Sequence, residues 1–197
     1  ASPATAATTP PAPNGELQLV SSSSGVNQDC VASVKNAIAL GDTSVSTDVC
    51  KFTTGVSTSA PQSVTLADLE EVRGSMSATE FSSLQLAAAA GTVKSKSYKQ
   101  NYDNVIVAWE QSGKFYYDGS RAWVTSSYRG YTGYHTCKVN RSIGYVIDVK
   151  KCDESGSTSQ RNQRAIYHSS AIPSGGLVNW STEMHFFVNS KGSTWAG

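Results

Sequence analysis

The chain lacks any long apolar run and is poor in charge. No stretch approaches the roughly 18 apolar residues of a membrane-spanning helix, so we expect no membrane span. Charged residues make up 16% of the sequence, against roughly 25% in typical soluble domains. A surface rich in Ser, Thr, Gly and Asn is typical of extracellular proteins. Ala1–Thr5 has the small residues that follow a cleaved signal peptide, so we predict a secreted protein.

Cysteine is scarce, with four residues in the whole chain. No Cys-x-x-Cys pair occurs and the three histidines are not at ligand spacing, so we expect neither a metal site nor a cofactor. An even, low count at wide spacing favours two disulfides in an oxidising compartment, and free buried thiols are the alternative. Each half of the chain holds two cysteines, which favours the pairs Cys30–Cys50 and Cys137–Cys152.

Motifs for nucleophilic catalysis and for nucleic-acid binding are also missing. No Gly-x-Ser-x-Gly sequence appears, the second-half lysines are scattered, and no aromatic RNA-binding signature is present, so we expect no nucleic-acid partner. Glu183 and His185 are two residues apart and share a face of one expected strand. With His135 they form a candidate acid–base set for a hydrolase, although a polar pair on a solvent-facing strand is the commoner explanation.

Charge is distributed unequally between the two halves of the chain. Residues 1–90 hold three basic and eight acidic side chains, a net of −5, and residues 91–197 hold thirteen basic and seven acidic, a net of +6. Such opposed halves can pack on each other, or the basic half can remain available to a partner.

The first 90 residues contain tail, strand and helix signals. Residues 1–25 are predicted to be a flexible Ala/Thr/Pro/Ser tail with a possible short strand at Glu16–Val20. That strand either joins the edge of the protein's own sheet or is donated to another chain. Residues 26–90 are predicted to be a helical annex, in which residues 53–63 form a linker. Its N-cap signals are Asn27-Gln28-Asp29, Thr65, and Ser77 with Glu80.

From about residue 91 onward, apolar residues recur at every second position, as they do in β-strands. Asp118-Gly119 is a strong hairpin signal, and several further strands follow at close spacing without room for a helical crossover. The fold class expected is α+β. Residues 91–197 form an antiparallel β-sandwich or barrel of about seven or eight strands, preceded by the small helical region. The expected core includes Trp109, Trp123, Trp180 and one of Phe186 and Phe187.

The segment from Ser126 to Tyr134 is rich in Tyr, Gly and Arg. Aromatic rings on a glycine-flanked backbone, with an arginine that can bind a carboxylate, are typical of binding loops. Packing of these tyrosines on their own neighbours is the alternative. The predicted binding residues are Tyr128, Arg129, Tyr131 and Tyr134.

Three features carry a resemblance over about residues 109–195. They are the Gly-Lys-Phe-Tyr-Tyr-Asp-Gly hairpin from Gly113, the Gly-Tyr-His-Thr-Cys strand ending at Cys137, and a second cysteine 15 residues on, before a long closing strand. This arrangement resembles small secreted proteins of actinomycetes. The resemblance implies export from a Gram-positive cell and no catalytic residues. Some such proteins are adaptors in antibacterial toxin particles and insert an extended N-terminal segment into a partner; Glu16–Val20 is similar in outline.

These patterns favour a non-enzymatic, secreted binding module. Its ligand would be an extracellular protein or a cell-surface glycan, recognised through the Tyr-rich loop. The alternatives are a secreted hydrolase that uses Glu183 and His185 with His135, and an adaptor or inhibitor in a secreted antibacterial toxin complex.

Overall fold

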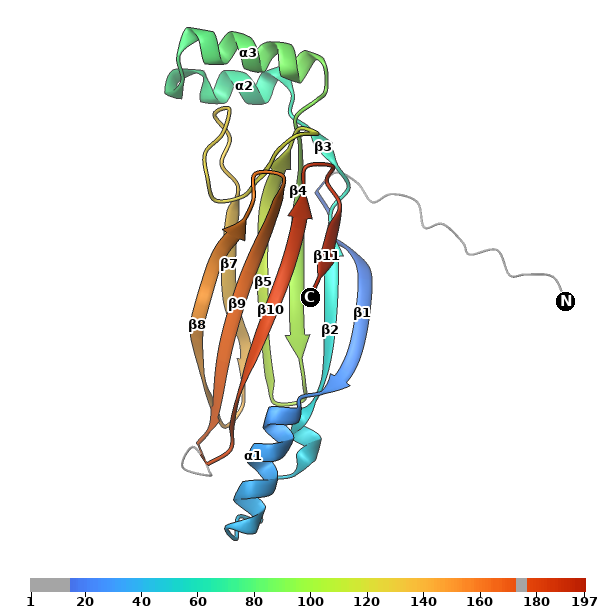
Figure 1. The fold of residues 1–197 in the computed structure, drawn as a ribbon, viewed down its shortest axis with the longest axis vertical. Coiled ribbons are helices and arrows are strands. Elements are labelled where there is room, and N and C mark those ends of the chain that lie inside the picture. Colours follow the sequence, from blue (N-terminus) through green and yellow to red (C-terminus); the bar gives the residue numbers. More distant parts are fainter. Residues whose placement is uncertain (1–14, 173–176) are drawn as a thin grey trace, which may run out of the picture.

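Two antiparallel β-sheets pack face to face in this computed structural model, which describes residues 15–172 and 177–197 (Figure 1). The first helix, α1, lies at one end of the long axis and the helical hairpin α2–α3 at the other. The predicted tail over residues 1–14 lies outside the described residues. Within the described residues the fold is a sandwich and not a closed barrel, because no strand pairing among them joins the two sheets into one.

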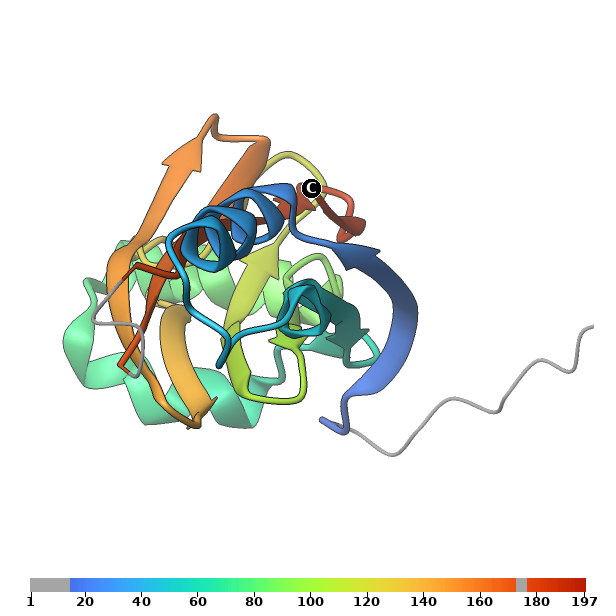
Figure 2. The same cartoon turned by 90° about the horizontal axis from the view of Figure 1, so that it is seen from below.

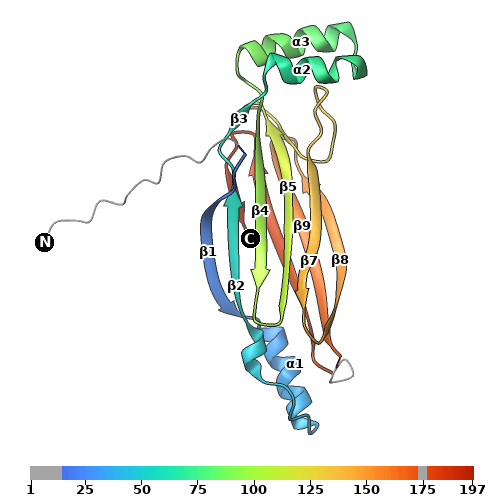
Figure 3. The same ribbon diagram turned by 180° about the vertical axis from the view of Figure 1, so that it is seen from behind.

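The large sheet has seven strands in the order β1-β2-β4-β5-β6, with β3 pairing to β4 and β7 pairing to β5 (Figure 3). Its strands are β1 (Gln18–Val26), β2 (Lys51–Thr58), β3 (Gln62–Ser63), β4 (Lys94–Asp103), β5 (Val107–Tyr117), β6 (Ala122–Trp123) and β7 (Tyr134–Ser142).

The small sheet has four strands in the order β11-β10-β9-β8. They are β8 (Tyr145–Gly156), β9 (Gln160–Ala171), β10 (Asn179–Asn189) and β11 (Thr194–Ala196). The chain passes from one sheet to the other at the short β7–β8 connection, and the Cys137–Cys152 disulfide joins the same two strands farther along. On the opposite side, between β1 and β11, the described part of the chain makes no such connection (Figure 2).

The interior is a stack of aromatic rings contributed by both sheets. The ring centroids of Phe52 and Tyr102 are 4.8 Å apart, those of Tyr102 and Trp109 4.4 Å, and those of Trp109 and Tyr167 5.1 Å. Stacked rings at this separation bury large areas and add a specific attraction between their faces. The predicted core is confirmed: Trp109, Trp123, Trp180 and Phe186 are all buried.

The three α-helices begin where the sequence places their caps. In α1 (Gln28–Ala39) the Asn27 side chain accepts a hydrogen bond from the Cys30 amide at 2.9 Å. Both α2 (Leu66–Val72) and α3 (Ala78–Ala89) begin with a capping box, formed by Thr65 with Asp68 and by Ser77 with Glu80. Short 3₁₀ turns, η1 (Thr47–Cys50) and η2 (Arg73–Ser75), follow α1 and α2. These caps satisfy amides that the first helical turn leaves unpaired.

The expectation of a helical annex over residues 26–90 needs correction. The predicted linker at 53–63 is largely β2, which pairs with β1 on one side and with β4 on the other. Its Ser, Thr and Gly residues resembled a linker, but Thr and Val suit a pleated strand once β4 supplies hydrogen bonds. Residues 91–197 are therefore not a separate sandwich, because β2 and β1 complete the large sheet. The predicted strand at Glu16–Val20 corresponds to the start of β1, and it lies on the protein's own sheet.

Candidate functional site

The Tyr-rich segment forms a tight hairpin turn. Arg129 and Gly130 have φ values of 53° and 77°. The amide and carbonyl groups of Tyr128 and Tyr131 bond to each other at 3.0 and 3.1 Å. Positive φ at both central residues is the geometry of a two-residue type I′ hairpin turn.

This turn lies beneath α2–α3 and is not a free binding loop (Figure 1). Tyr131 is only 7% exposed and belongs to a cluster with Leu69, Phe81 and Leu84 of the two helices. Its carbonyl oxygen accepts a hydrogen bond from the Trp123 indole at 3.1 Å, and burial raises the pKa of Tyr131 to about 12. Tyr131 is therefore a core residue, contrary to the expectation that it contacts a partner.

The other three residues of the predicted site are more accessible than Tyr131, and the Arg129 guanidinium lies 5.3 Å from the centre of the Tyr128 ring. Tyr128 is half-buried, with its ring centroid 5.0 Å from that of Trp123. Arg129 forms an ion pair with Asp118 at 3.4 Å. Tyr134 is 53% exposed, at the start of β7. The apolar faces of α2 and α3 need a surface to cover, and the Tyr-rich turn provides it.

His135, Glu183 and His185 do not converge either. His135 points between the sheets, where its Nδ1 lies 2.8 Å from the hydroxyl of buried Tyr98. Glu183 and His185 alternate with buried Met184 and Phe186 along β10, so they lie on the outer face of the small sheet. The acid–base set expected for a hydrolase is thus divided between an interior and an exterior position.

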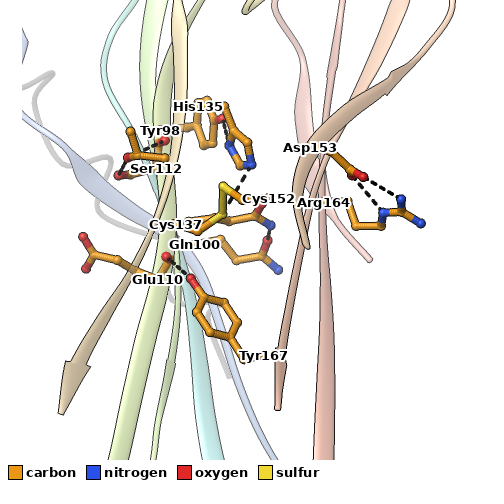
Figure 4. Close-up of a disulfide and its surroundings, with 12 residues drawn as sticks. Tyr98, Gln100, Glu110, Ser112, His135, Cys137, Cys152, Asp153, Arg164 and Tyr167 are labelled. Carbon is orange, nitrogen blue, oxygen red and sulfur yellow. Dashed lines mark hydrogen bonds and ion pairs between the residues drawn. A yellow bond between two sulfur atoms is a disulfide. The ribbon is translucent and has the colours of Figure 1, made fainter. Parts of the chain in front are cut away.

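His135 is half-buried beside the disulfide (Figure 4). Its Nε2 lies 3.6 Å from Cys137 Sγ, and burial lowers the pKa of the imidazole, although Glu154 and Asp153 oppose the shift. His135, Cys137 and Cys152 bring metal-ligand atom types within 4.8 Å of one another. Both sulfurs are bonded to each other in the disulfide, so neither is a thiolate ligand.

On the outer face of the small sheet, Glu183 belongs to a network of polar contacts. His185 Nε2 lies 3.2 Å from Glu183 Oε1, and His185 Nδ1 lies 3.0 Å from the side-chain nitrogen Nδ2 of Asn162. Arg164 approaches the same Glu183 oxygen at 3.9 Å and binds Asp153 with two hydrogen bonds of 2.9 and 2.7 Å (Figure 4). This arrangement cross-links β8, β9 and β10 and offers no nucleophile.

Sequence reasoning missed a row of Asp148, His168 and Ser181, which are direct neighbours on β8, β9 and β10. His168 Nδ1 lies 3.0 Å from Ser181 Oγ. The Asp148 carboxylate, however, binds Lys150 at 2.9 Å. The row lies on the outer face of the small sheet, where Asp148 and Ser181 are both exposed. Strand pairing alone brings these residues together, so no spacing along the chain could have indicated it.

The open side of the sandwich contains a groove between β1–β2 and β10–β11, which we call the edge groove. Its lower part, near α1, has a volume of about 520 Å³, and its upper part, near Trp195, about 640 Å³. Ser23, Thr54, Gln100 and Ala196 line both parts, so the two are continuous. The lower part contains two acidic residues, Asp29 and Glu183, and none of its described lining residues is Lys or Arg.

The floor of the lower edge groove mixes apolar and polar groups. Phe52, Tyr102 and Met184 line it together with Thr182. Burial raises the pKa of Tyr102 to about 12, and the adjacent side chains of Thr182 and Trp180 reduce that shift. The floor can therefore accept an apolar side chain and still provide hydroxyl groups for hydrogen bonds.

One wall of the lower edge groove is an unpaired strand edge. β11 pairs with Phe186–Val188, and Gly197 exchanges both backbone hydrogen bonds with His185. Backbone groups alternate in direction along a strand, so those of Ser181 and Glu183 point the same way as those of His185. Among the described residues no strand pairs with Ser181 or Glu183 on that side.

The two predicted disulfides are present in the structure. Cys30–Cys50 joins α1 to η1 at the end of the sandwich, and Cys137–Cys152 joins the two sheets. They indicate an oxidising environment. Within the described ranges, helices are too short or too polar to cross a membrane. In comparisons with protein-family models, with curated proteins and with solved structures, nothing matches this chain.

Proposed function

We propose that the protein is a secreted, non-enzymatic binding module that holds an extended segment of another extracellular protein in its lower edge groove. The observation that carries this proposal is the unpaired edge of β10 at Ser181 and Glu183, which faces a groove of about 520 Å³. Strand addition supplies the missing hydrogen bonds, and pockets for alternate side chains give specificity.

The groove also defines the chemistry of the bound segment. A strand beside β10 directs alternate side chains to the floor at Phe52 and Met184, so small or apolar residues fit there. The intervening side chains point to the rim, where the carboxylates of Asp29 and Glu183 favour a basic residue. An adaptor in a toxin complex is one protein of this kind.

A library of random linear peptides displayed on phage tests the proposal, with selected peptides measured by fluorescence anisotropy. Ser181→Pro removes one edge amide, and proline is tolerated at a strand edge. Ser181→Ala is the matched control, since it removes the same hydroxyl and keeps the amide. We expect Ser181→Pro to weaken binding about tenfold or more and Ser181→Ala to have little effect.

Three results would contradict strand addition. They are a failure to select any peptide, equal affinity of wild type and Ser181→Pro, and equal losses in the two variants when both remain folded by circular dichroism. A glycan is the competing ligand, because hydroxyl and amide side chains line the upper edge groove next to Trp195, which is 39% exposed. Binding to polysaccharides that Trp195→Ala abolishes and Ser181→Pro leaves intact would favour the glycan.

A further inference from the structure

The disulfide that joins the two sheets is the more accessible of the two in this protein. Cys152 is exposed and Cys137 is half-buried, whereas Cys30 and Cys50 are both fully buried. A thiol that exchanges with a disulfide must first reach one of its sulfurs. Exposure of Cys152 gives a thiol in solution that access, and burial of Cys30 and Cys50 denies it.

His135 presents a hydrogen to the other sulfur of the same disulfide. Its Nε2 lies 3.6 Å from Cys137 Sγ, and its Nδ1 lies 2.8 Å from the hydroxyl oxygen of Tyr98 (Figure 4). Within the described part of the chain Nδ1 is the one hydrogen-bond partner of that hydroxyl, so the hydroxyl donates to it. Burial raises the pKa of Tyr98, so the hydroxyl keeps its proton. A neutral imidazole that accepts at Nδ1 carries its hydrogen on Nε2.

The two sulfurs therefore differ in chemistry as well as in exposure. Cleavage of a disulfide leaves one sulfur as a thiolate, and the sulfur whose thiolate is better stabilised leaves faster. The hydrogen on His135 Nε2 stabilises a thiolate at Cys137. Hydrogen bonds to charged acceptors are stronger than those to neutral ones, so this contact strengthens as the bond between the sulfurs breaks.

Charged side chains beside the disulfide favour the approach of a thiolate. Lys138 and Lys151 are exposed and directly adjoin the two cysteines in the sequence. Two acidic residues follow Cys152, and each is paired with an arginine: Asp153 with Arg164, and Glu154 with Arg161. The lysines therefore act on an incoming thiolate with little opposition from the carboxylates, and nearby positive charge favours the thiolate form.

We infer that the Cys137–Cys152 disulfide is an exchange site for an external thiol. The incoming thiolate forms a bond to the exposed sulfur of Cys152. The bond between Cys152 and Cys137 breaks, and its electron pair stays on Cys137 as a thiolate beside His135 Nε2. The product is a mixed disulfide at Cys152. A substrate with a second thiol then attacks its own sulfur in that mixed disulfide, leaves as an oxidised disulfide, and passes an electron pair to the two cysteines.

This reaction is stoichiometric and takes place away from the proposed peptide site. The disulfide joins β7 to β8, on the side of the sandwich opposite the edge groove. None of the described residues that line the edge groove is His135, Cys137 or Cys152. The exchange site and the peptide site therefore stand or fall independently.

Incubation of the full chain with reduced glutathione, used as the probe thiol, tests the inference. Aliquots are blocked with N-ethylmaleimide, and mass spectrometry of the peptides then locates each adduct. We expect glutathione on Cys152 and maleimide on Cys137, with Cys30 and Cys50 still joined to each other. The position of the adduct in the wild type needs no variant.

His135→Phe keeps a flat ring and removes the hydrogen that faces the sulfur. We expect glutathione exchange in this variant to slow about tenfold or more, because the Cys137 thiolate loses a hydrogen bond. A merely structural role would have the opposite effect, since a loosened fold exposes both sulfurs and speeds exchange. His168→Phe is the matched control on the outer face of the small sheet, and it should leave the rate unchanged.

Four results would overturn the inference. They are the absence of any adduct, glutathione mainly on Cys137, equal modification of the two disulfides, and exchange in His135→Phe that is as fast as in the wild type or faster. Failure of the peptide experiment would leave these measurements untouched, because that experiment reports on β10.

Discussion

Removal of the two disulfides should have unequal effects on stability, although their loops are similar in length. Cys137–Cys152 closes a separation of 15 residues and Cys30–Cys50 one of 20. Restriction of the unfolded chain alone then contributes about 3 kcal/mol for each. The surroundings differ, because Cys30 and Cys50 are both fully buried, whereas Cys137 is half-buried and Cys152 is exposed.

Alanine at Cys30 and Cys50 should therefore cost more than alanine at Cys137 and Cys152. The first double variant removes two sulfur atoms from the cluster that joins α1 to Trp109 and Trp180, and each space left there costs about 1 kcal/mol more. We expect a loss of about 5 kcal/mol for that variant. The Cys137/Cys152 double variant should lose about 3 kcal/mol, because solvent already reaches one of its sulfurs.

Urea denaturation followed by tryptophan fluorescence measures both losses, and the slope of each transition must be fitted separately because cross-links change it. A partial reduction series supplies a kinetic control: Cys137–Cys152 should be reduced first, since Cys152 is exposed. Equal losses in the two double variants, or a larger loss at Cys137 and Cys152, would refute the argument from burial.

Three further predictions concern other parts of the molecule. Burial lowers the pKa of His135 from 6.5, so the unfolded chain binds more protons below that pH. The free energy of unfolding should therefore decrease as the pH falls below about 6.5, and thermal melts of His135→Gln should show a smaller decrease. Tyr131→Ala should cost about 3–5 kcal/mol in urea denaturation, because it empties the space beneath α2–α3, whereas Tyr131→Phe keeps the ring and should cost far less. Residues 92–197 expressed alone should aggregate in size-exclusion chromatography, because β4 loses its pairing with β2.

Helix starts were predictable because capping is local. Thr65 and Ser77 each bond to a residue three positions on, so the information lies within one helical turn. The alternation of buried and outward residues in β10 is equally local. Both disulfide pairs also followed from the sequence, since each pair lies within one half of the chain.

The sequence did not predict β2, because the strands that pair with it are distant along the chain. Its composition resembles that of a linker, and only its position between β1 and β4 makes it a strand. Strand propensity depends on neighbours more than helix propensity does. Thr54, for example, pairs with Ser23 of β1, more than 25 positions earlier in the chain. On its other side it pairs with Tyr102 of β4, more than 40 positions later.

In the candidate site, too, some features were predictable from local sequence and others depend on segments that are distant in the chain. The sequence by itself indicated a glycine-flanked loop over Ser126–Tyr134, and Gly130 adopts a positive φ there at low cost. The tertiary structure alone decided that α2–α3 covers this turn, and that Ser181 and Glu183 of β10 line a groove together with Phe52 of β2. Whether a surface is covered depends on contacts between distant segments, and the pattern within any one segment does not contain them.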